Sequence, residues 1–275
     1  MAEHLRPRER ILYTMKRLPV DRTPCDIWYT GEVMNSLLAY FGASSVFEVY
    51  ESLGVDKILF LEATNTRKVQ KEGPLITTQW GNKVQFVENA SGGYEETVYY
   101  PLEGVEDILT IQNYDWPRAD DFDYETLRKS CIEGNRYIRM LSFVSIFEIY
   151  CKLKPMDQAL MDLYINQDFA HAIIKRLLDF QKSYILQAAM TCGRELEIVY
   201  LSDDMGMQDR PLMSLSVWEE YFKAPYQELI DLIHSLGMYT FYHSDGAAYE
   251  VLASMVEMGV DIINPIQYVC PGMER

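Results

Sequence analysis

The sequence predicts an α/β fold built around a parallel sheet. Short apolar runs alternate with longer helical stretches, which is the pattern of repeated strand–helix units. Each apolar run is followed by polar side chains, as expected where a parallel sheet presents a ligand site at the carboxyl ends of its strands. At 275 residues the chain is long enough for one large domain, and we expect a single domain over residues 1–275.

Six apolar runs are the predicted strands, and helical stretches precede or separate them. Two of these helices end at glycines, Gly54 and Gly259, which suit a helix C-terminus. The predicted strands lie at 23–29, 55–61, 137–143, 197–201, 238–242 and 260–264, and the predicted helices at 8–17, 45–53, 169–191, 218–236 and 247–258.

The stretch 74–100 breaks this rhythm. Its residues alternate between apolar and polar with a period of two, and short glycine-containing segments (Gly81-Asn82 and Ser91-Gly92-Gly93) separate the alternating runs. This pattern is typical of antiparallel hairpins. Because about 30 residues cannot bury a core of their own, we expect an excursion from the parallel sheet and not a separate domain.

Composition excludes several classes of protein. With 25 Lys+Arg against 41 Asp+Glu, the net charge of −16 argues against nucleic-acid binding. No apolar run approaches the roughly 18 residues of a membrane span, and charges interrupt the basic N-terminal segment too often for a signal peptide. The five cysteines are scattered without a CxxC pair, as expected for reduced thiols in a cytoplasmic protein. Dinucleotide-binding, P-loop and GxSxG hydrolase motifs are missing from the sequence.

The candidate site residues follow the predicted strands directly. In a parallel sheet these positions meet at one edge, so we expect their side chains to converge around a polar ligand. In chain order the candidates are Tyr29, Glu62, Glu148, Asp203, Asp204, Gln208, His243, Asp245 and Asn264.

Several of these residues have a structural interpretation as well. Asp203 and Asp204 could cap the N-terminus of a helix, because a carboxylate accepts from the free N–H groups there. His243 alone could be a structural hydrogen bonder. Asp245 strengthens a functional interpretation, because side chains two residues apart on an extended segment share a face and could reach one metal ion or one substrate. Cys270 is expected to be an ordinary thiol.

Several sequence blocks resemble the uroporphyrinogen decarboxylase superfamily, and in particular its methyltransferase branch. The opening Pro7-Arg8-Glu9-Arg10-Ile11-Leu12 with Val20-Asp21-Arg22-Thr23-Pro24 is similar to that family's entry segment. The connector 114–124, the block 202–214 and the pair of blocks 242–246 and 259–267 are similar to further family segments. The resemblance extends over essentially the whole chain.

This resemblance implies a TIM (β/α)8 barrel of the uroporphyrinogen decarboxylase type. It implies a methyltransferase that moves a methyl group between a methylated small molecule, a corrinoid carried by a partner protein, and a thiol coenzyme. His243, Asp245 and Glu148 would be catalytic, with zinc held by His243 and Asp245. The substrate-binding residues would be Asp203, Asp204, Gln208, Asn264, Glu62 and Tyr29.

Two departures from the family pattern bear on this implied function. Zinc-dependent members carry His-x-Cys and a later Cys, whereas this chain has Asp245 in place of the first Cys. A carboxylate is a harder ligand than a thiolate, so the site would tolerate metals other than zinc. It could also bind substrate without a metal. The decarboxylases hold a tetrapyrrole's carboxylates with an arginine-rich segment after the first strand. Here residues 28–33 contain no arginine, and Glu62 stands where a catalytic aspartate is expected. Decarboxylation of uroporphyrinogen therefore ranks third among the functions.

Barrel closure needs eight strands, and only six are predicted. We therefore expect the chain to lack the last two βα units of the barrel. An open edge strand would then favour pairing with a second copy of the chain. The second-ranked function follows from this expectation: a non-catalytic, incomplete barrel retained for partner binding.

Overall fold

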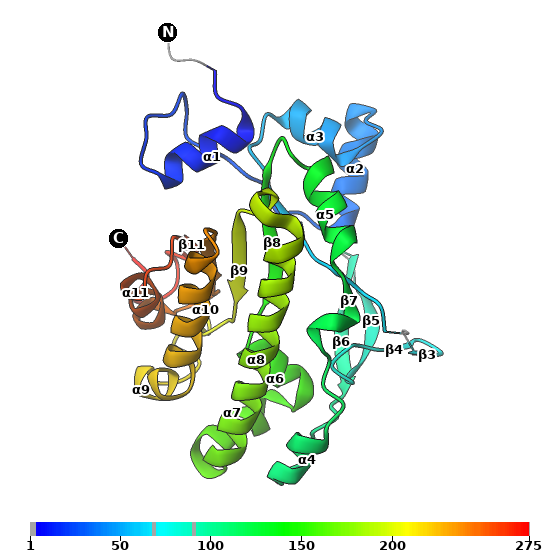
Figure 1. Cartoon of the computed structure of the whole chain (residues 1–275), viewed down its shortest axis with the longest axis vertical. Helices are drawn as coiled ribbons and strands as arrows, with labels where there is room; N and C mark the ends of the chain where they lie inside the picture. Colours follow the sequence, from blue (N-terminus) through cyan, green and yellow to red (C-terminus); the bar gives the residue numbers. More distant parts are fainter. Residues whose placement is uncertain (1–3, 68–69, 90–91, 275) are drawn as a thin grey trace.

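The computed structural model describes residues 4–67, 70–89 and 92–274 and contains a five-stranded parallel sheet (Figure 1). The strands lie side by side in the order β1-β8-β9-β10-β11, and all four pairings are parallel. Each crossover moves to the next strand in the same direction, as in a barrel wall. Their bounds are β1 (Ile58–Leu61), β8 (Ile138–Val144), β9 (Ile198–Ser202), β10 (Tyr239–His243) and β11 (Ile262–Asn264).

This sheet confirms the predicted α/β class and five of the six predicted strands. It does not confirm a complete TIM barrel, because in the described ranges the sheet does not close and β1 and β11 are its two edges.

The strand predicted at 23–29 was wrong. This segment is irregular and runs beside the start of β1, where Asp56 N donates to Cys25 O at 2.7 Å. Cys25 N donates to the Asp56 carboxylate at 2.9 Å, and Lys57 Nζ donates to Ile27 O at 3.0 Å. Side chains therefore form hydrogen bonds with backbone N–H and C=O groups that would pair with a neighbouring strand in a regular sheet.

Helices cover one face of the sheet, and α8 and α10 lie in front of it in Figure 1. Apolar side chains of these helices pack on alternate strand residues such as Leu141, Val199 and Tyr242 to form the main core. The bounds are α1 (Pro7–Met15), α2 (Gly31–Phe41), α3 (Val46–Leu53), α4 (Ile108–Asn113), α5 (Tyr124–Glu133), α6 (Phe147–Leu153), α7 (Met156–Ile165), α8 (Gln167–Cys192), α9 (Leu215–Trp218), α10 (Ala224–Ser235) and α11 (Tyr249–Glu257). A π-helical turn, Glu219–Lys223, joins α9 to α10, so the helix predicted at 218–236 is interrupted.

The opposite face of the sheet positions the site. Strand side chains alternate between faces, and Met140, Tyr200 and Phe241 belong to a second core against which α1 packs through Ile11. In β10 this parity brings His243 to the same face as Phe241. The register pairs His243 with Ser202 on one side and with Asn264 on the other.

The hairpins predicted at 74–100 are confirmed as a separate antiparallel sheet. It contains β3 (Gln70–Glu72), β4 (Leu75–Thr77), β5 (Lys83–Asn89) and β6 (Gly92–Tyr99), in that order. The predicted turn residue Ser91 lies outside the described residues. Two short strands, β2 (Thr64–Asn65) and β7 (Phe122–Asp123), pair separately.

Within the described part of the chain, each helix is either too short or too polar to cross a bilayer.

Candidate metal centre

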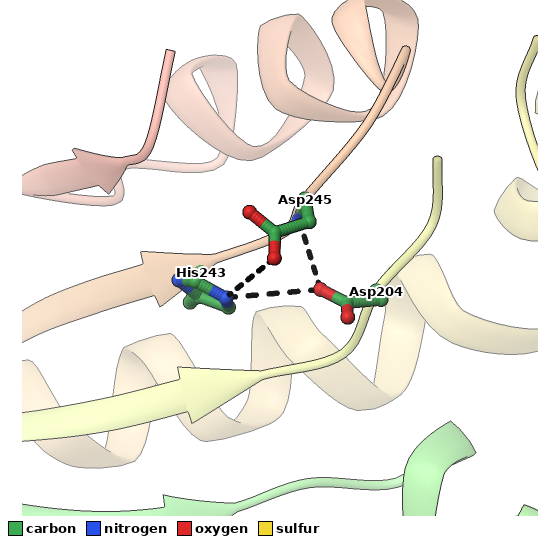
Figure 2. A group of neighbouring side chains, drawn as sticks. All are labelled: Asp204, His243 and Asp245. Carbon is green, nitrogen blue, oxygen red and sulfur yellow. Dashed lines mark hydrogen bonds and ion pairs between the residues drawn. The ribbon is translucent and has the colours of Figure 1, made fainter. Parts of the chain in front are cut away.

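Three side chains converge just beyond the carboxyl ends of β9 and β10 (Figure 2). His243 Nε2 lies 3.8 Å from Asp204 Oδ1 and 3.8 Å from Asp245 Oδ2. Asp245 N donates a 2.8 Å hydrogen bond to Asp204 Oδ1, which ties the two loops together. The sequence grouped His243 with Asp245, and the structure adds Asp204, which had been predicted as a substrate ligand. We call Asp204, His243 and Asp245 the triad.

Asn264 sets the tautomer of His243. The Asn264 Oδ1 atom lies 2.9 Å from His243 Nδ1, and since an amide oxygen can only accept, Nδ1 carries the proton. In the neutral imidazole, Nε2 is then unprotonated, and its lone pair is directed toward the carboxylates of Asp204 and Asp245. Metal-binding histidines are held in this way, with the second ring nitrogen donating to a fixed oxygen.

The triad is accessible from solvent. The side chains of Asp204 and Asp245 are 48% and 46% exposed, whereas His243 is 13% exposed. Aromatic rings enclose the imidazole: Trp28 lies 5.5 Å and Tyr200 5.7 Å from it, centroid to centroid. A ligand can therefore reach the carboxylates while the histidine ring stays fixed.

Two glycines allow the β9 and β10 loops to meet. A Cβ built on Gly206 would lie 2.5 Å from the carbonyl oxygen of Asp245, and one built on Gly246 would lie 2.5 Å from the backbone of Gly206. Gly246 also has φ +82°, in the region that favours glycine. Met205 N donates to Ser244 Oγ at 2.9 Å across the same contact.

Gln267 fixes the orientation of Asp245. Its Nε2 donates to Asp245 Oδ1 at 2.9 Å, and its Oε1 accepts from Gly246 N at 2.7 Å. Cys270 is buried and donates its thiol hydrogen to Gln267 Oε1 at 3.5 Å, so it lies behind the triad as a structural thiol. The predicted ligand Gln208 is exposed and faces Cys270, with Sγ 4.0 Å from its Oε1.

Asp203 is directed away from the triad, to the helix-covered face. It is fully buried, and its carboxylate accepts from Ser145 Oγ, from Tyr226 Oη and from the backbone N–H groups of 146–148. Burial raises the pKa of Asp203, and the hydrogen bonds from Tyr226, Ser145 and the backbone oppose that shift. The capping interpretation therefore applies to Asp203, and the structure replaces its predicted substrate contact with a role in holding the start of α6.

Glu148 lies close to the strand ends without belonging to the triad. Ser202 Oγ donates to Glu148 Oε1 at 3.3 Å, and Ser202 is the register partner of His243. Burial, with the nearby charge of Asp203, raises the pKa of Glu148 to about 7. A carboxyl group with this pKa can hold or release a proton near neutral pH.

The structure does not bring Tyr29 and Glu62 to the triad. Tyr29 Oη contacts Tyr50 Oη, and the Tyr29 ring packs near Lys57 at the far edge of the sheet. Glu62 follows β1, which β8 and β9 separate from β10. Burial raises the pKa of Glu62.

Sequence reasoning missed Trp28 and did not select Ser202 or Gln267 as site residues. Ser202 and Gln267 stand next to predicted site residues, so their position gave a signal. No sequence signal marked Trp28 as a site residue, because its aromatic partners are all distant in sequence: Phe60, Tyr200, Phe241 and His243.

The donor set of the triad fits a divalent cation. One imidazole nitrogen and two carboxylate oxygens lie within 4.8 Å of one another. Two ligand atoms at the usual distance from a tetrahedral ion are about 3.4 Å apart. The 3.8 Å separations therefore need to shorten by only a few tenths of an ångström. Oxygen and nitrogen ligands of this kind suit zinc, manganese, iron or cobalt.

The fold and the site define a parallel α/β protein with a candidate metal centre at the carboxyl ends of its strands. Among solved structures, a methyltransferase from Methanosarcina mazei is similar in fold: it aligns with a TM-score of 0.62 at 14% sequence identity, covering 94% of this chain and 75% of that one. No protein-family model matches the chain, and no curated protein matches it.

Proposed function

We propose that this protein is a metal-dependent methyltransferase whose metal is held by Asp204, His243 and Asp245. The observation that carries the proposal is the convergence of these three donors at the strand ends, with His243 Nε2 freed as a lone pair by Asn264. The fold shared with a methyltransferase from Methanosarcina mazei supports the reaction class.

A divalent cation bound there would favour the thiolate form of a thiol acceptor, the nucleophile that takes up a methyl group. The methylated donor would be a small molecule or a corrinoid carried by a partner protein. The exposed carboxylates of Asp204 and Asp245 face the side from which such a partner could approach.

The surrounding residues have separate tasks in this proposal. Asn264 and Gln267 hold His243 and Asp245 in their binding orientations. Glu148, with its pKa of about 7, would accept the proton that the thiol releases, and Ser202 connects it to the strand ends. The triad presents carboxylates, which repel an anionic porphyrinogen, so uroporphyrinogen decarboxylation stays a distant third.

The second candidate is a partner-binding protein without catalytic activity. The observation that favours it is the edge of β11, which is unpaired in the described residues and lies next to the exposed Ile266, Tyr268 and Val269. A homo-oligomer formed through this edge is part of that candidate.

Metal content and methyl transfer test the proposal together. Zinc or manganese is added to three purified proteins, which are then dialysed: the wild type, His243→Ala and Asp204→Ala. Mass spectrometry then measures the metal content of each protein. Methyl transfer from methylcobalamin to 2-mercaptoethanol is followed by the absorbance of the released cob(I)alamin. His234→Ala is the matched control, because His234 pairs with Asp261 away from the triad.

We expect near-stoichiometric metal and metal-dependent transfer in the wild type and in the control variant, and the loss of both in the two triad variants. A wild type that retains no metal, or transfer that the triad variants leave unchanged, contradicts the proposal. A folded protein that binds no metal and forms oligomers through β11 supports the second candidate.

A further inference from the structure

A cavity of about 480 Å³ lies beside β1, away from the residues that the proposed function uses. Its wall comes from the segment 27–29, from β1 and from the helices α3 and α5. Aromatic side chains contribute much of this wall: Trp28, Tyr29, Phe47, Tyr50 and Phe60. An apolar cavity of about 150 Å³ is enough to bind benzene, so a substituted ring fits in this one.

Three polar side chains of the wall, Tyr29, Tyr50 and Lys57, already have partners, and Glu133 on α5 also lines the cavity and is exposed to solvent. Tyr29 and Tyr50 share a hydrogen bond between their hydroxyl groups. Lys57 is buried, and its Nζ donates to both oxygens of Asp26 at 3.0 and 3.2 Å and to Ile27 O at 3.0 Å. Lys57 and Asp26 therefore neutralise each other, and neither is free to pair with a charge on a ligand.

The aromatic rings are arranged to receive another ring. Trp28 meets Phe60 edge to face at 5.1 Å, and Phe47 and Tyr50 meet at 79°. Aromatic side chains in such orientations offer both faces and edges, which favours a further aromatic partner over an aliphatic one of the same size. The Lys57 ammonium lies 5.6 Å from the Phe60 ring and 5.9 Å from the Tyr29 ring, so it already occupies the cation–π positions on these two rings.

Trp28 connects this cavity to the triad. Its ring lines the cavity and also packs against His243. Its side chain is 48% exposed, so both sites open near the same indole.

We propose that this cavity binds an uncharged aromatic ring, as the non-reacting part of the substrate whose methyl group is handled at the triad. The assignment of the ring to the substrate rests on the proposed function, whereas binding of the ring by the cavity does not.

Calorimetric titration of the full chain with four probes tests the chemical class. The probes are anisole, cyclohexyl methyl ether, benzoate and phenyltrimethylammonium. We expect saturable binding of anisole, about two- to tenfold tighter than that of cyclohexyl methyl ether, the factor of one aromatic pair. Benzoate and phenyltrimethylammonium should bind more weakly than anisole. No saturable anisole binding, or tighter binding of either charged probe, overturns the proposal.

Variants that fill the cavity from two different helices test the location. Val46→Trp on α3 and Ser130→Trp on α5 should each weaken anisole binding by at least about tenfold, a loss of about 1.4 kcal/mol. Lys129→Trp is the matched control, because Lys129 is the exposed neighbour of Ser130 on the same helix and does not line the cavity. Circular dichroism checks that each variant is folded. Unchanged binding in a folded filled variant overturns the assignment to this cavity.

Metal dependence separates this proposal from the proposed function. Anisole binding is repeated with metal-free protein and with Asp245→Ala, a variant of the triad outside the cavity wall. We expect binding within about twofold of the wild type in both, because the cavity wall contains no triad residue. A wild type that takes up no metal when metal is supplied but binds anisole contradicts the proposed function alone, and a wild type that binds metal but not anisole contradicts the cavity alone.

Discussion

Replacing Asn264 tests whether the tautomer of His243 prepares the triad for metal. In Asn264→Ala the acceptor for Nδ1–H is lost, and the imidazole proton can move to Nε2, between the two carboxylates. A cation must then displace that proton. The lost 2.9 Å hydrogen bond contributes about 1 kcal/mol, or about fivefold in affinity, and loss of tautomer control adds to this. The total should fall in the range of about 10- to 100-fold observed for groups that orient metal ligands.

Asn264→Asp is the matched variant, because a carboxylate keeps the acceptor and forms a stronger hydrogen bond to Nδ1–H. We expect its zinc affinity to equal or exceed that of the wild type. The assay is calorimetric titration with zinc and with manganese at pH 7.5, with urea unfolding to confirm that both variants are folded. If Asn264→Ala binds zinc as tightly as the wild type while Asp204→Ala does not bind it, the tautomer reasoning is refuted.

Three further predictions concern pH, stability and loop contact. Since burial raises the pKa of Glu148 to about 7 from its ordinary value of 4.5, its neutral form stabilises the fold below pH 4.5, and this contribution is lost as the pH rises through 7. Glu148→Gln should therefore be more stable than the wild type at pH 8 by up to about 3 kcal/mol and nearly equal to it at pH 4.5, as measured by urea unfolding. Equal stability of the two proteins at both pH values would show that burial of the ionised Glu148 carboxylate does not destabilise the fold. Arg139→Met leaves the buried Glu197, which it contacts at 2.6 Å, without its main partner and should lower the free energy of unfolding by about 3 kcal/mol, against less than about 1 kcal/mol for the exposed Arg128→Met. Gly206→Ala should separate the β9 and β10 loops and weaken zinc binding by more than about tenfold, because its Cβ would lie 2.5 Å from backbone that cannot move aside; calorimetry that gives the wild-type affinity would contradict this.

The sequence predicted five strands and the convergence of their ends because both depend on local pattern and on a general rule for parallel sheets. His243, Asp245, Asp204 and Asn264 were all expected at this edge, and the structure brings them together. The rule that the carboxyl ends of parallel strands meet at one edge does not specify which side chains after a strand lie on the face that carries the triad. Asp203 and Asp204 look equivalent in the sequence, yet Ser202 occupies the site-facing position of β9, so Asp203 points to the helices.

Other features depended on contacts that a linear pattern does not contain. The segment 23–29 has the composition of a strand, but the Asp56 carboxylate takes its backbone N–H at Cys25. Trp28 joins the site only because distant strands carry its aromatic partners. The raised pKa of Glu148 likewise arises from burial beside Asp203, and the sequence marked only its position after a strand.

The origin of the three donors bears on what the chain needs in order to bind a metal. Asp204 follows β9, His243 ends β10 and Asp245 follows β10, so two adjacent strands supply the three donors of the candidate centre. The groups that orient them, Asn264 and Gln267, follow from the next strand. Because ligands and orienting groups span only three neighbouring strands, closure of the sheet into a barrel is not required to build this centre. With two carboxylate oxygens and one imidazole nitrogen as donors, the candidate centre should accept manganese or iron more readily than a site built from cysteine thiolates would.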